Sequence, residues 1–476
     1  MDTITDSKPG ADATYGSVTF LGDLGFEVEA PVTHLTRHLV VFTLHHGEPA
    51  LRASEVLPEF KLRLRDRTVF AGRAVVKQPV LNGTQLVVEA TLEDGWIETE
   101  LPSTAPPALR AAFAEFLDHW QKLHRIDREF KVLVADMQMF LIDLRLWLEQ
   151  IEVGIRAAPP SEQAQLEHEM ARGLSPHTTG AIDNFFSRFE EIARRLEPEL
   201  HPLHRAFARR QLHPLLLCAP FLRRTYHKPL GYAGDYEMVN MICRDPFEGG
   251  SLFARLVNYW FLQQPPAVAH RNRLGYLGER IADVSVRASG EGRIARILTL
   301  GCGPAHEIQR FIEEKPFCDR THFTLLDFND ETLAATCMRL EEIKRQHHRT
   351  TSIVTTKKSV NNILKEASRA VGPAAQYDFV YCAGLFDYLT APMCQRLSGI
   401  LYDWLLPGGL LVTTNVDSSN PRRLIMDFVM DWHLIYRDGR ELAALRPERV
   451  AADACEIKSD LTGVNIYSEI RKPDRA

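Results

Sequence analysis

Hydrophobic and polar positions follow three successive patterns along the chain. From Ser17 to Trp96, short apolar runs rich in β-branched residues alternate with polar positions, and glycines and an Asn-Gly pair at 82–83 separate them. Runs of this kind between turn residues are typical of antiparallel strands. The first hundred residues therefore predict an antiparallel β barrel or sandwich.

A helical pattern begins after a proline-rich stretch at 102–107. Apolar residues recur at three- and four-residue spacings over 109–153 and again over 179–196, which is the period of a helix with one buried face. We expect the aromatic residues of these helices to pack in a core rather than to bind a cofactor.

A third pattern begins at Arg296, where apolar runs alternate with helix-compatible stretches. The first run meets Gly301, Cys302 and Gly303. Glycines at such a turn let the backbone approach a ligand closely, while the next helix presents free N–H groups. The second run ends in Asp327, in the position from which a carboxylate accepts hydrogen bonds from a ribose.

Further apolar runs at 352–356, 377–389 and 405–416, and a final pair around Thr462 and Gly463, complete this region. Five β/α units with ligand-facing carboxyl ends predict a doubly wound parallel sheet. The expected architecture is multidomain α/β, with a β-barrel domain at 1–101, a helical domain at 102–227, a substrate-binding segment of helices and loops at 228–293 and the α/β domain at 294–476.

The order of elements over about 294–472, with a Pro-Gly-Gly turn before the fifth strand and a final hairpin, resembles class I S-adenosylmethionine-dependent methyltransferases. The resemblance implies a seven-stranded, Rossmann-like sheet and S-adenosylmethionine as the cofactor. It also implies a set of cofactor-binding residues: Gly301, Cys302, Gly303, Asp327, Asn361 or its neighbour Val360, Ala383 and Gly384.

Two positions depart from the pattern of that family. Thr299 stands where the family has an acid, and Ala305 stands where it has a third glycine. Glu307, in the first turn of the following helix, is a candidate partner for the ammonium group of the cofactor. NAD is the competing cofactor because a glycine turn and a ribose carboxylate serve both, but the broken GxGxxG pattern and the final hairpin favour S-adenosylmethionine.

Two further resemblances concern other parts of the chain. GYAGDYEMVNMI, EGGSLF and PPAVAHRNR resemble, from about residue 220 to the C-terminus, bacterial methyltransferases of extracellular factor 3-hydroxypalmitic acid methyl ester biosynthesis. GDLGFEVEA resembles the turn before a strand in PilZ domains. Asp23, Leu24 and Gly25 do not form the DxSxxG motif of that family and no RxxxR precedes them, so cyclic di-GMP binding is not expected.

A methyl acceptor has to be held close to the donor in a pocket that excludes water. The segment 228–277 is dense in glycine, proline, ionisable and aromatic residues. The candidate catalytic residues are Tyr232, Asp235, Tyr236, His270 and Arg271, and the candidate substrate-binding residues are Asp387, Tyr388, Tyr436 and Arg437.

The chemistry of the acceptor decides which side chains it needs. A carboxylate needs a cation, for which Arg271, Arg273, Arg422 and Arg437 are candidates. A hydroxyl, amine or thiol needs a base, for which Asp235, Glu237, Asp387 and His270 are candidates. The alternative that Asp235 caps a helix and Arg271 pairs with a structural carboxylate stays open.

Composition limits the classes of partner. A net charge of −6 is not the basic footprint of a nucleic-acid-binding protein. The eight cysteines have no metal-ligand spacing, so no metal site is expected. With neither a targeting segment nor an apolar stretch near the roughly 20 residues of a membrane span, we expect a cytoplasmic protein. The expected partner is a small-molecule acceptor, and the sequence sets no oligomeric state.

Two expectations about function follow. Because the glycine turn and Asp327 both lie beyond Arg296, we expect cofactor binding to be independent of residues 1–100. The alternative to an enzyme is a non-catalytic regulatory protein that responds to S-adenosylmethionine or another ligand.

Overall fold

The computed structural model describes residues 16–93 apart from 23–25, 37, 46–50, 65–66 and 83–84, then 126–368 and 376–474, with positions 110, 113–114 and 117 besides. Residues 23–25, which carry the resemblance to PilZ domains, lie outside these ranges, so that resemblance stays a prediction. The same holds for Gly83, the stretch 102–107 and most of 109–125.

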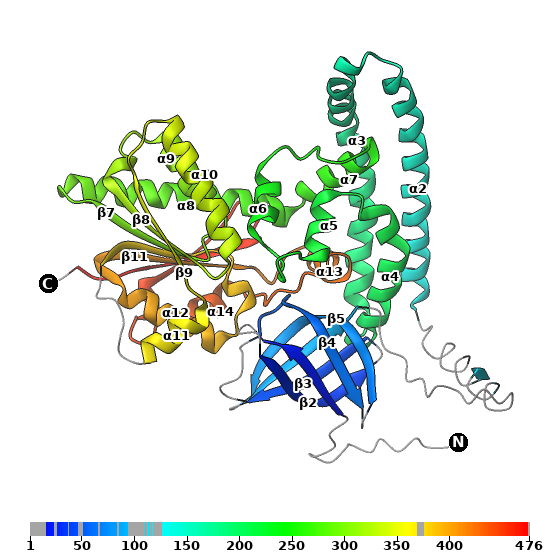
Figure 1. The fold of residues 1–476 in the computed structure, drawn as a ribbon, viewed down its shortest axis with the longest axis horizontal. Helices are drawn as coiled ribbons and strands as arrows, with labels where there is room; N and C mark the ends of the chain where they lie inside the picture. Colours follow the sequence, from blue (N-terminus) through cyan, green and yellow to red (C-terminus); the bar gives the residue numbers. More distant parts are fainter. Residues whose placement is uncertain are drawn as a thin grey trace.

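The N-terminal strands close into a barrel below the rest of the molecule (Figure 1). They are β1 (Gly16–Leu21), β2 (Glu27–Thr36), β3 (Leu39–His45), β4 (Val56–Leu64), β5 (Arg67–Asn82) and β6 (Gln85–Leu92). The order β1-β2-β3-β6-β5-β4 is closed and every pairing is antiparallel, so the predicted antiparallel domain is a barrel rather than a sandwich. The rings of Phe20, Phe42 and Phe60 pack in its interior.

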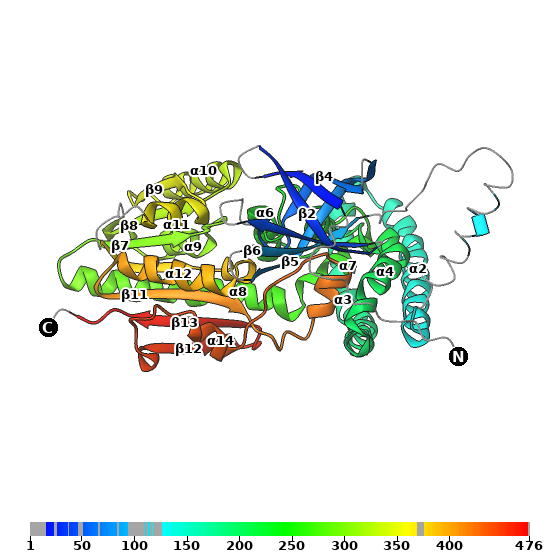
Figure 2. The ribbon, with the colours of Figure 1, turned by 90° about the horizontal axis from the view of Figure 1, so that it is seen from below.

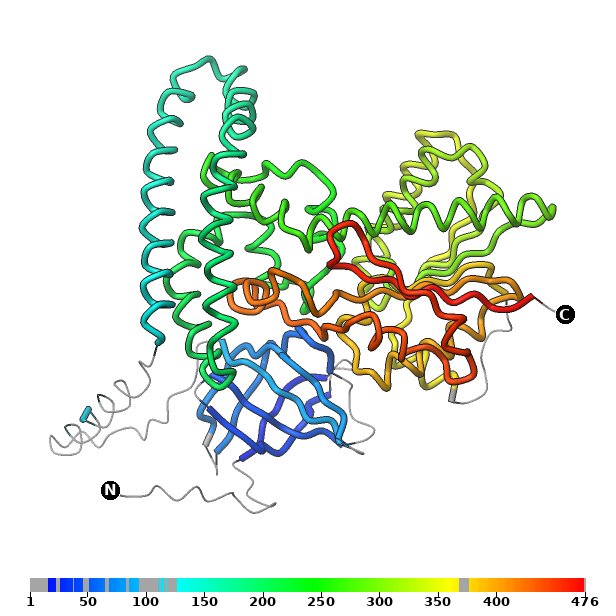
Figure 3. The backbone as a smooth tube through the Cα atoms, turned by 180° about the vertical axis from the view of Figure 1, so that it is seen from behind, coloured from blue at the N-terminus to red at the C-terminus, as the bar shows by residue number. Residues whose placement is uncertain are grey.

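A bundle of helices stands beside the barrel. It contains α2 (Arg128–Arg156), α3 (Pro160–Arg195), α4 (His201–Leu216), α5 (Pro220–His227) and α7 (Leu252–Leu262). The long helices α2 and α3 run antiparallel and extend past their neighbours (Figure 3). The apolar periodicity of 179–196 is the last part of α3, where Phe186 stacks on Trp260 with ring centroids 4.4 Å apart. The aromatic residues of this helix therefore form core.

The third body is a seven-stranded sheet with the order β12-β13-β11-β10-β7-β8-β9. Its strands are β7 (Ala295–Leu300), β8 (Thr321–Asp327), β9 (Ser352–Lys357), β10 (Tyr377–Cys382), β11 (Leu405–Val416), β12 (Cys455–Ser459) and β13 (Asn465–Arg471). The five strands from β7 to β11 are parallel, and β13 runs antiparallel to β11 and β12. The order reverses between β7 and β10, and such a reversal opens a crevice at the carboxyl ends of the strands.

Helices cover both faces of the sheet (Figures 1 and 2). One face carries α8 (Pro265–Gly290), α9 (His306–Glu314) and α10 (Asp330–Gln346), and the other carries α11 (Val360–Ser368), α12 (Ala391–Asp403) and α14 (Gly439–Ala444). Successive side chains of a strand point to opposite faces. On β7, Ile297 accordingly packs with the first set and Leu298 with the second.

Segments that are neighbours in the chain pack against different bodies, and the expected domain boundaries stay a prediction. Within 228–293, α7 packs against α3 in the bundle, whereas α8 packs against α9 and the sheet. The later helix α13 (Arg423–Phe428) enters the bundle, where Phe428 lies 5.8 Å from Phe189. The apolar face of α13 is thus buried against α3, although the two helices are far apart in the sequence. Among the described residues, no helix combines the length and the apolar character that crossing a membrane requires.

Candidate functional site

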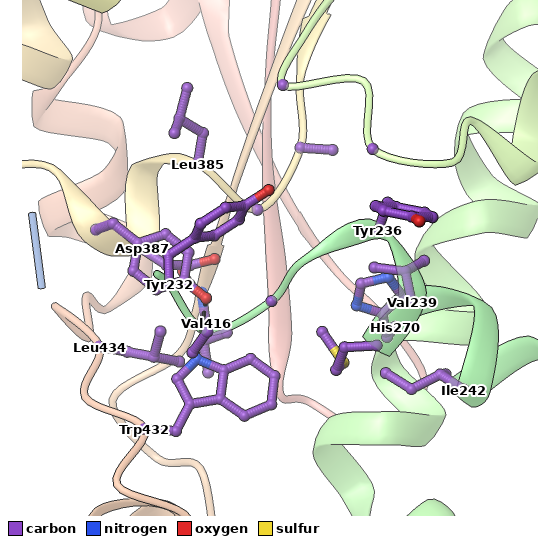
Figure 4. A pocket seen from close by; sticks show the side chains of 18 of the residues that line it. Tyr232, Tyr236, Val239, Ile242, His270, Leu385, Asp387, Val416, Trp432 and Leu434 are labelled. Atoms are coloured by element: carbon purple, nitrogen blue, oxygen red, sulfur yellow. Dashed lines mark hydrogen bonds between the residues drawn. The ribbon is translucent and has the colours of Figure 1, made fainter. Parts of the chain in front are cut away.

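A cavity of about 410 Å³ lies at the carboxyl ends of β7, β8 and β10. Its walls come from the sheet, from α6 (Tyr236–Cys243) and α8, from the bundle and from the barrel. Figure 4 shows Tyr236, Val239, Ile242 and His270 on one side, with Leu385, Asp387, Val416, Trp432 and Leu434 on the other. The described residues include no cluster of His, Cys, Asp or Glu arranged to hold a metal ion.

The glycine turn after β7 forms one end of the cavity. Gly301 has φ +70° and donates its N–H to the carbonyl of Leu326 at 2.8 Å. This left-handed conformation is favourable for glycine, which has no Cβ to clash with its own backbone. The hydroxyl of Thr336 donates to the carbonyl of Gly303 at 2.7 Å. Leu326 belongs to β8 and Thr336 to α10, so the turn is held by the β/α unit that follows it in the chain.

Asp327, the last residue of β8, faces this turn. Its carboxylate accepts the N–H of Gly303 at 3.3 Å and that of Asn329 at 3.1 Å. Burial raises the pKa of Asp327, and the two N–H groups oppose that rise. The ring of Phe328, the next residue, lies 5.0 Å from the ring of Tyr232. A buried carboxylate beside aromatic rings suits a ribose with an attached base.

A second buried carboxylate lies in the first turn of α9. Glu307 is 5% exposed and accepts a hydrogen bond from the hydroxyl of Tyr381 on β10 at 2.7 Å. That hydroxyl also interacts with Thr299, the residue that stands in place of the expected acid. Burial raises the pKa of Glu307, and the bond from Tyr381 opposes the rise. An acidic group is thus present in this region although Thr299 is not acidic.

Arg273 of α8 lies between His270 and the exit of β10. Its Nη2 is 3.0 Å from Nδ1 of His270, and a Cβ on Gly384 would lie 3.0 Å from its Nη1. Its buried Nε has no hydrogen-bond partner within the described part of the chain. Burial first, and then the charge of Arg273, hold the pKa of His270 well below its usual value. The cavity therefore contains a cation beside a neutral imidazole.

The other half of the cavity is apolar. It is lined from α5, α6, α7 and the segment around α13 by Phe221, Met238, Val239, Ile242, Phe261, Ile425, Met426, Met430, Trp432 and Leu434. Gln264 and Arg422 also line the cavity, and Arg422 donates to Gln264 at 2.7 Å, to Ser187 at 3.1 Å and to Asp183. The charge of Arg422 is therefore already compensated.

Most of the candidate residues are brought together in this cavity. Its lining includes Tyr232, Tyr236, His270, Gly301, Cys302, Gly303, Asp327, Ala383, Gly384, Asp387 and Tyr388. Asp235, Arg271, Asn361, Tyr436 and Arg437 are outside the lining.

Asp235 and Arg271 are bonded to other parts of the protein. Asp235 is the N-cap of α6, where its carboxylate accepts the N–H of Met238 at 2.8 Å and pairs with Arg224 at 2.8 Å. Arg271 donates to the carbonyls of Ile242 at 3.2 Å and Leu262 at 3.0 Å. The cap interpretation of Asp235 is therefore the one that the geometry supports, while Arg271 binds the ends of α6 and α7 rather than a carboxylate.

The other three residues are displaced for local reasons. At the start of α11 it is Val360 that lines the cavity, because successive helical residues point in different directions. Tyr436 packs under the guanidinium of Arg423 at 4.5 Å. Arg437 is buried and donates to the carbonyls of Phe386 and Leu389 and to Asn415.

Asp387 and Tyr388 line the cavity, and the side chain of each also forms a hydrogen bond within the protein. The carboxylate of Asp387 accepts the N–H of Val416 at 2.6 Å, and burial raises its pKa. The hydroxyl of Tyr388 accepts the indole N–H of Trp432 at 2.9 Å. Glu237, another candidate base, is bonded to Asn240 and Arg244 and is absent from the lining.

The barrel is the part of the site that the sequence did not predict. Leu21, Gly22, Arg52, Ala53, Glu55 and Val56 line the same cavity. The cavity wall therefore includes residues of the first hundred, and the expectation that cofactor binding is independent of them stays a prediction. The alternation of apolar and polar residues predicts which side chains face the interior of the barrel. It does not predict which residues of the connecting loops contact another domain.

Comparison with known proteins gives only remote likenesses. No protein-family profile matches the chain, and no curated protein matches it. A possible exported protein from Bordetella parapertussis has 16% sequence identity and a TM-score of 0.42, with 67% of this chain and all of that chain covered. An N-methyltransferase from Bradyrhizobium japonicum, solved with S-adenosyl-L-homocysteine, has 15% identity and a TM-score of 0.31 over 53% of this chain and all of its own.

A third likeness is to magnesium protoporphyrin IX methyltransferase from Synechocystis, with 9% identity and a TM-score of 0.35 over 53% of this chain and 98% of its own. None of these TM-scores reaches 0.5. The function of this chain consequently rests on the geometry of its own cavity.

Proposed function

We propose that this protein is an S-adenosylmethionine-dependent methyltransferase that acts on a small-molecule acceptor. One observation carries the proposal. A single cavity joins a glycine turn and a buried carboxylate at the carboxyl ends of parallel strands to an apolar chamber built by the helices. The first half suits a nucleoside cofactor, and the second suits an acceptor.

The residues of the first half match the groups of S-adenosylmethionine. Asp327 would accept hydrogen bonds from the ribose hydroxyls, as the resemblance implies. Arg273, whose Nε has no hydrogen-bond partner within the described residues, would bind the carboxylate of the methionine portion. Glu307 would pair with its ammonium group. Gly384 would let the cofactor pass, since a side chain there would meet Arg273.

The chemistry requires little of the protein beyond placement. The bound donor would supply an electrophilic methyl group. The chain would align the acceptor atom with it at roughly 3 Å and exclude water, for which Val416, Trp432 and Leu434 form a wall. His270 is neutral and would accept a proton from a hydroxyl, amine or thiol acceptor. Tyr232 and Tyr236 line the cavity and their rings would contact the acceptor, while the hydroxyl of Tyr236 donates to Glu331 at 2.9 Å.

The chamber favours an acceptor with a largely apolar body. Of the cations considered for a carboxylate acceptor, Arg271 and Arg437 are outside the lining and Arg422 is already paired, which leaves Arg273. Its guanidinium would then serve the acceptor carboxylate and the methionine carboxylate of the donor together. The resemblance of residues 220 onwards makes a long-chain 3-hydroxy carboxylate the first acceptor to test. Such an acceptor needs no general base, because its carboxylate is already ionised near neutral pH.

The proposal is tested by ligand binding and turnover. Calorimetry with S-adenosyl-L-homocysteine should show one site, and NADH should show none. Methyl-labelled S-adenosylmethionine should transfer its label to a member of a panel of carboxylates, alcohols, amines and thiols with apolar bodies. No binding of S-adenosyl-L-homocysteine would contradict the proposal, and binding without transfer to any extractable metabolite would favour the regulatory alternative.

A further inference from the structure

The connection between β3 and β4 brings part of the barrel to the cofactor half of the cavity. Arg52, Ala53, Glu55 and Val56 line the cavity there, together with Leu21 at the end of β1 and Gly22 after it. None of these six residues belongs to the apolar core cluster of the barrel. The barrel therefore contributes to the cavity from outside its own core.

Three sets of hydrogen bonds hold this loop in place. The N–H of Val56 donates to the carbonyl of Gly231 at 2.7 Å, and that of Ala53 donates to the carbonyl of Tyr388 at 3.4 Å. The hydroxyl of Ser54 donates to the carbonyl of His433 at 2.8 Å and accepts its N–H at 2.6 Å. The partners Gly231, Tyr388 and His433 come from three separate segments of the chain, so the loop is fixed at several points along its length.

Ser54 also shows how closely the loop is fitted. It is fully buried and has φ +61°, a conformation that residues other than glycine adopt at a cost. Its two hydrogen bonds to His433 offset that cost. The loop is therefore shaped by its contact with the rest of the protein.

Arg52 reaches the residue that follows the ribose-binding candidate. Its guanidinium lies over the ring of Phe328, 4.3 Å from the centroid, and its charge opposes the rise in the pKa of Asp327. The carboxylate of Glu55 accepts the N–H of Arg52 at 2.8 Å and lies 3.8 Å from its Nε. The side chain of Arg52 is 18% exposed. A guanidinium stacked on an aromatic ring has its planar group fixed in orientation.

We propose that the N-terminal barrel supplies part of the adenosyl-binding site, with Arg52 packing against the adenosine portion of the methyl donor beside Asp327. This inference rests on the proposed function. The planar guanidinium would cover the nucleoside, and its charge would keep the neighbouring carboxylate ionised, the form that accepts both ribose hydroxyls. The barrel would thus be a working part of the enzyme.

The test uses the full-length chain, S-adenosyl-L-homocysteine as the probe and calorimetry as the readout. Arg52→Ala should bind about tenfold more weakly, and Arg52→Lys should recover part of the loss, since an ammonium group keeps the charge without the planar stack. Arg63→Ala is the matched control, because Arg63 is an exposed arginine of the same barrel, absent from the cavity lining. Its affinity should equal that of the wild type.

A second variant covers the case in which Arg52→Ala does not fold. Ser54→Gly keeps a residue that tolerates the positive φ but removes both hydrogen bonds to His433, so S-adenosyl-L-homocysteine should dissociate several-fold faster in stopped flow. Wild-type affinity in folded Arg52→Ala, or wild-type dissociation in Ser54→Gly, would contradict the role of the barrel. No binding by the wild-type chain would instead contradict the proposed function.

Discussion

The main-chain N–H of Gly303 donates to Oδ2 of Asp327 across 3.3 Å, so the turn after β7 and the end of β8 form one unit. Because β7 and β8 are adjacent and parallel, their carboxyl ends meet at the same edge of the sheet. A ligand that displaces or shares this bond contacts two successive β/α units at once.

Replacing Asp327 by alanine should weaken binding of S-adenosyl-L-homocysteine by about 1 to 3 kcal/mol, because a charged acceptor for ribose hydroxyls is lost. Calorimetry measures the change. Asp330→Ala is the control, since Asp330 is exposed and its carboxylate forms an ion pair with Lys357 at the surface. If a folded Asp327→Ala protein bound S-adenosyl-L-homocysteine as tightly as the wild type, Asp327 would not be a cofactor-binding residue.

Filling the apolar chamber should separate turnover from cofactor binding. Val239 is 8% exposed and lines the acceptor side, so Val239→Trp should reduce turnover at least tenfold, about 1.4 kcal/mol in the barrier, with little change in affinity for S-adenosyl-L-homocysteine. Val286→Trp is the control because Val286 is 57% exposed on α8. Loss of cofactor affinity in Val239→Trp would show that the two halves are not separate.

Asp235 should matter for stability rather than for the reaction. Alanine there removes the cap of α6 and leaves Arg224 without its carboxylate, which should lower the stability by about 1 to 3 kcal/mol. Urea unfolding measures this, and Asp438→Ala gives the comparison, since Asp438 caps α14 at an exposed position and should cost less. A folded Asp235→Ala protein that binds S-adenosyl-L-homocysteine normally but cannot transfer methyl groups would return Asp235 to the acceptor site.

His213 should make the protein less stable in acid. Burial lowers its pKa to about 4, against about 6.5 in the unfolded chain, and its Nε2 lies 2.8 Å from the carbonyl of Val429. Between these values the unfolded chain binds a proton that the native protein does not, so stability falls as the pH falls from about 6.5 to 4.

His213→Gln keeps a donor for that carbonyl but does not titrate. Its stability relative to the wild type should therefore rise by about 2 to 3 kcal/mol between pH 7 and pH 4, measured by urea unfolding at each pH. Glu190, whose pKa burial raises to about 7, acts in the opposite direction but is present in both proteins and cancels in the difference. Parallel stability curves would contradict the assignment of a neutral, buried His213.

The central strands β7, β8, β10 and β11 were predictable because each is built on an apolar run that ends at a glycine or a polar residue. Ile297 and Leu298 are both buried, on opposite faces, as expected for a strand covered on both sides. The ligand-facing turn was predictable for the same reason, since Gly301 and Asp327 follow two such runs directly. Local sequence therefore determined this half of the cavity.

The acceptor half depends on contacts that local sequence does not encode. Asp235 and Arg271 belong to a segment rich in polar residues. Asp235 pairs with Arg224 and Arg271 donates to the carbonyl of Leu262, and these bonds connect helices to one another. A shift of one residue at the start of α11 exchanges Asn361 for Val360 in the wall. Arg52 reaches the site from a loop of another domain. In each case the deciding contact is tertiary.

The insertion of α13 into the bundle also bears on the order in which the protein is made. The N–H groups of Leu424 and Ile425 are bonded to the carboxylate of Glu190, which lies 234 residues before Leu424. During synthesis, α3, α4 and α7 leave the ribosome before α13, the helix that completes their core, has been translated. Until then the nascent chain exposes Phe130 and Phe189, which later cover Phe428. The barrel, whose six strands are contiguous, can close long before, so the early chain consists of one finished domain and one awaiting its last helix.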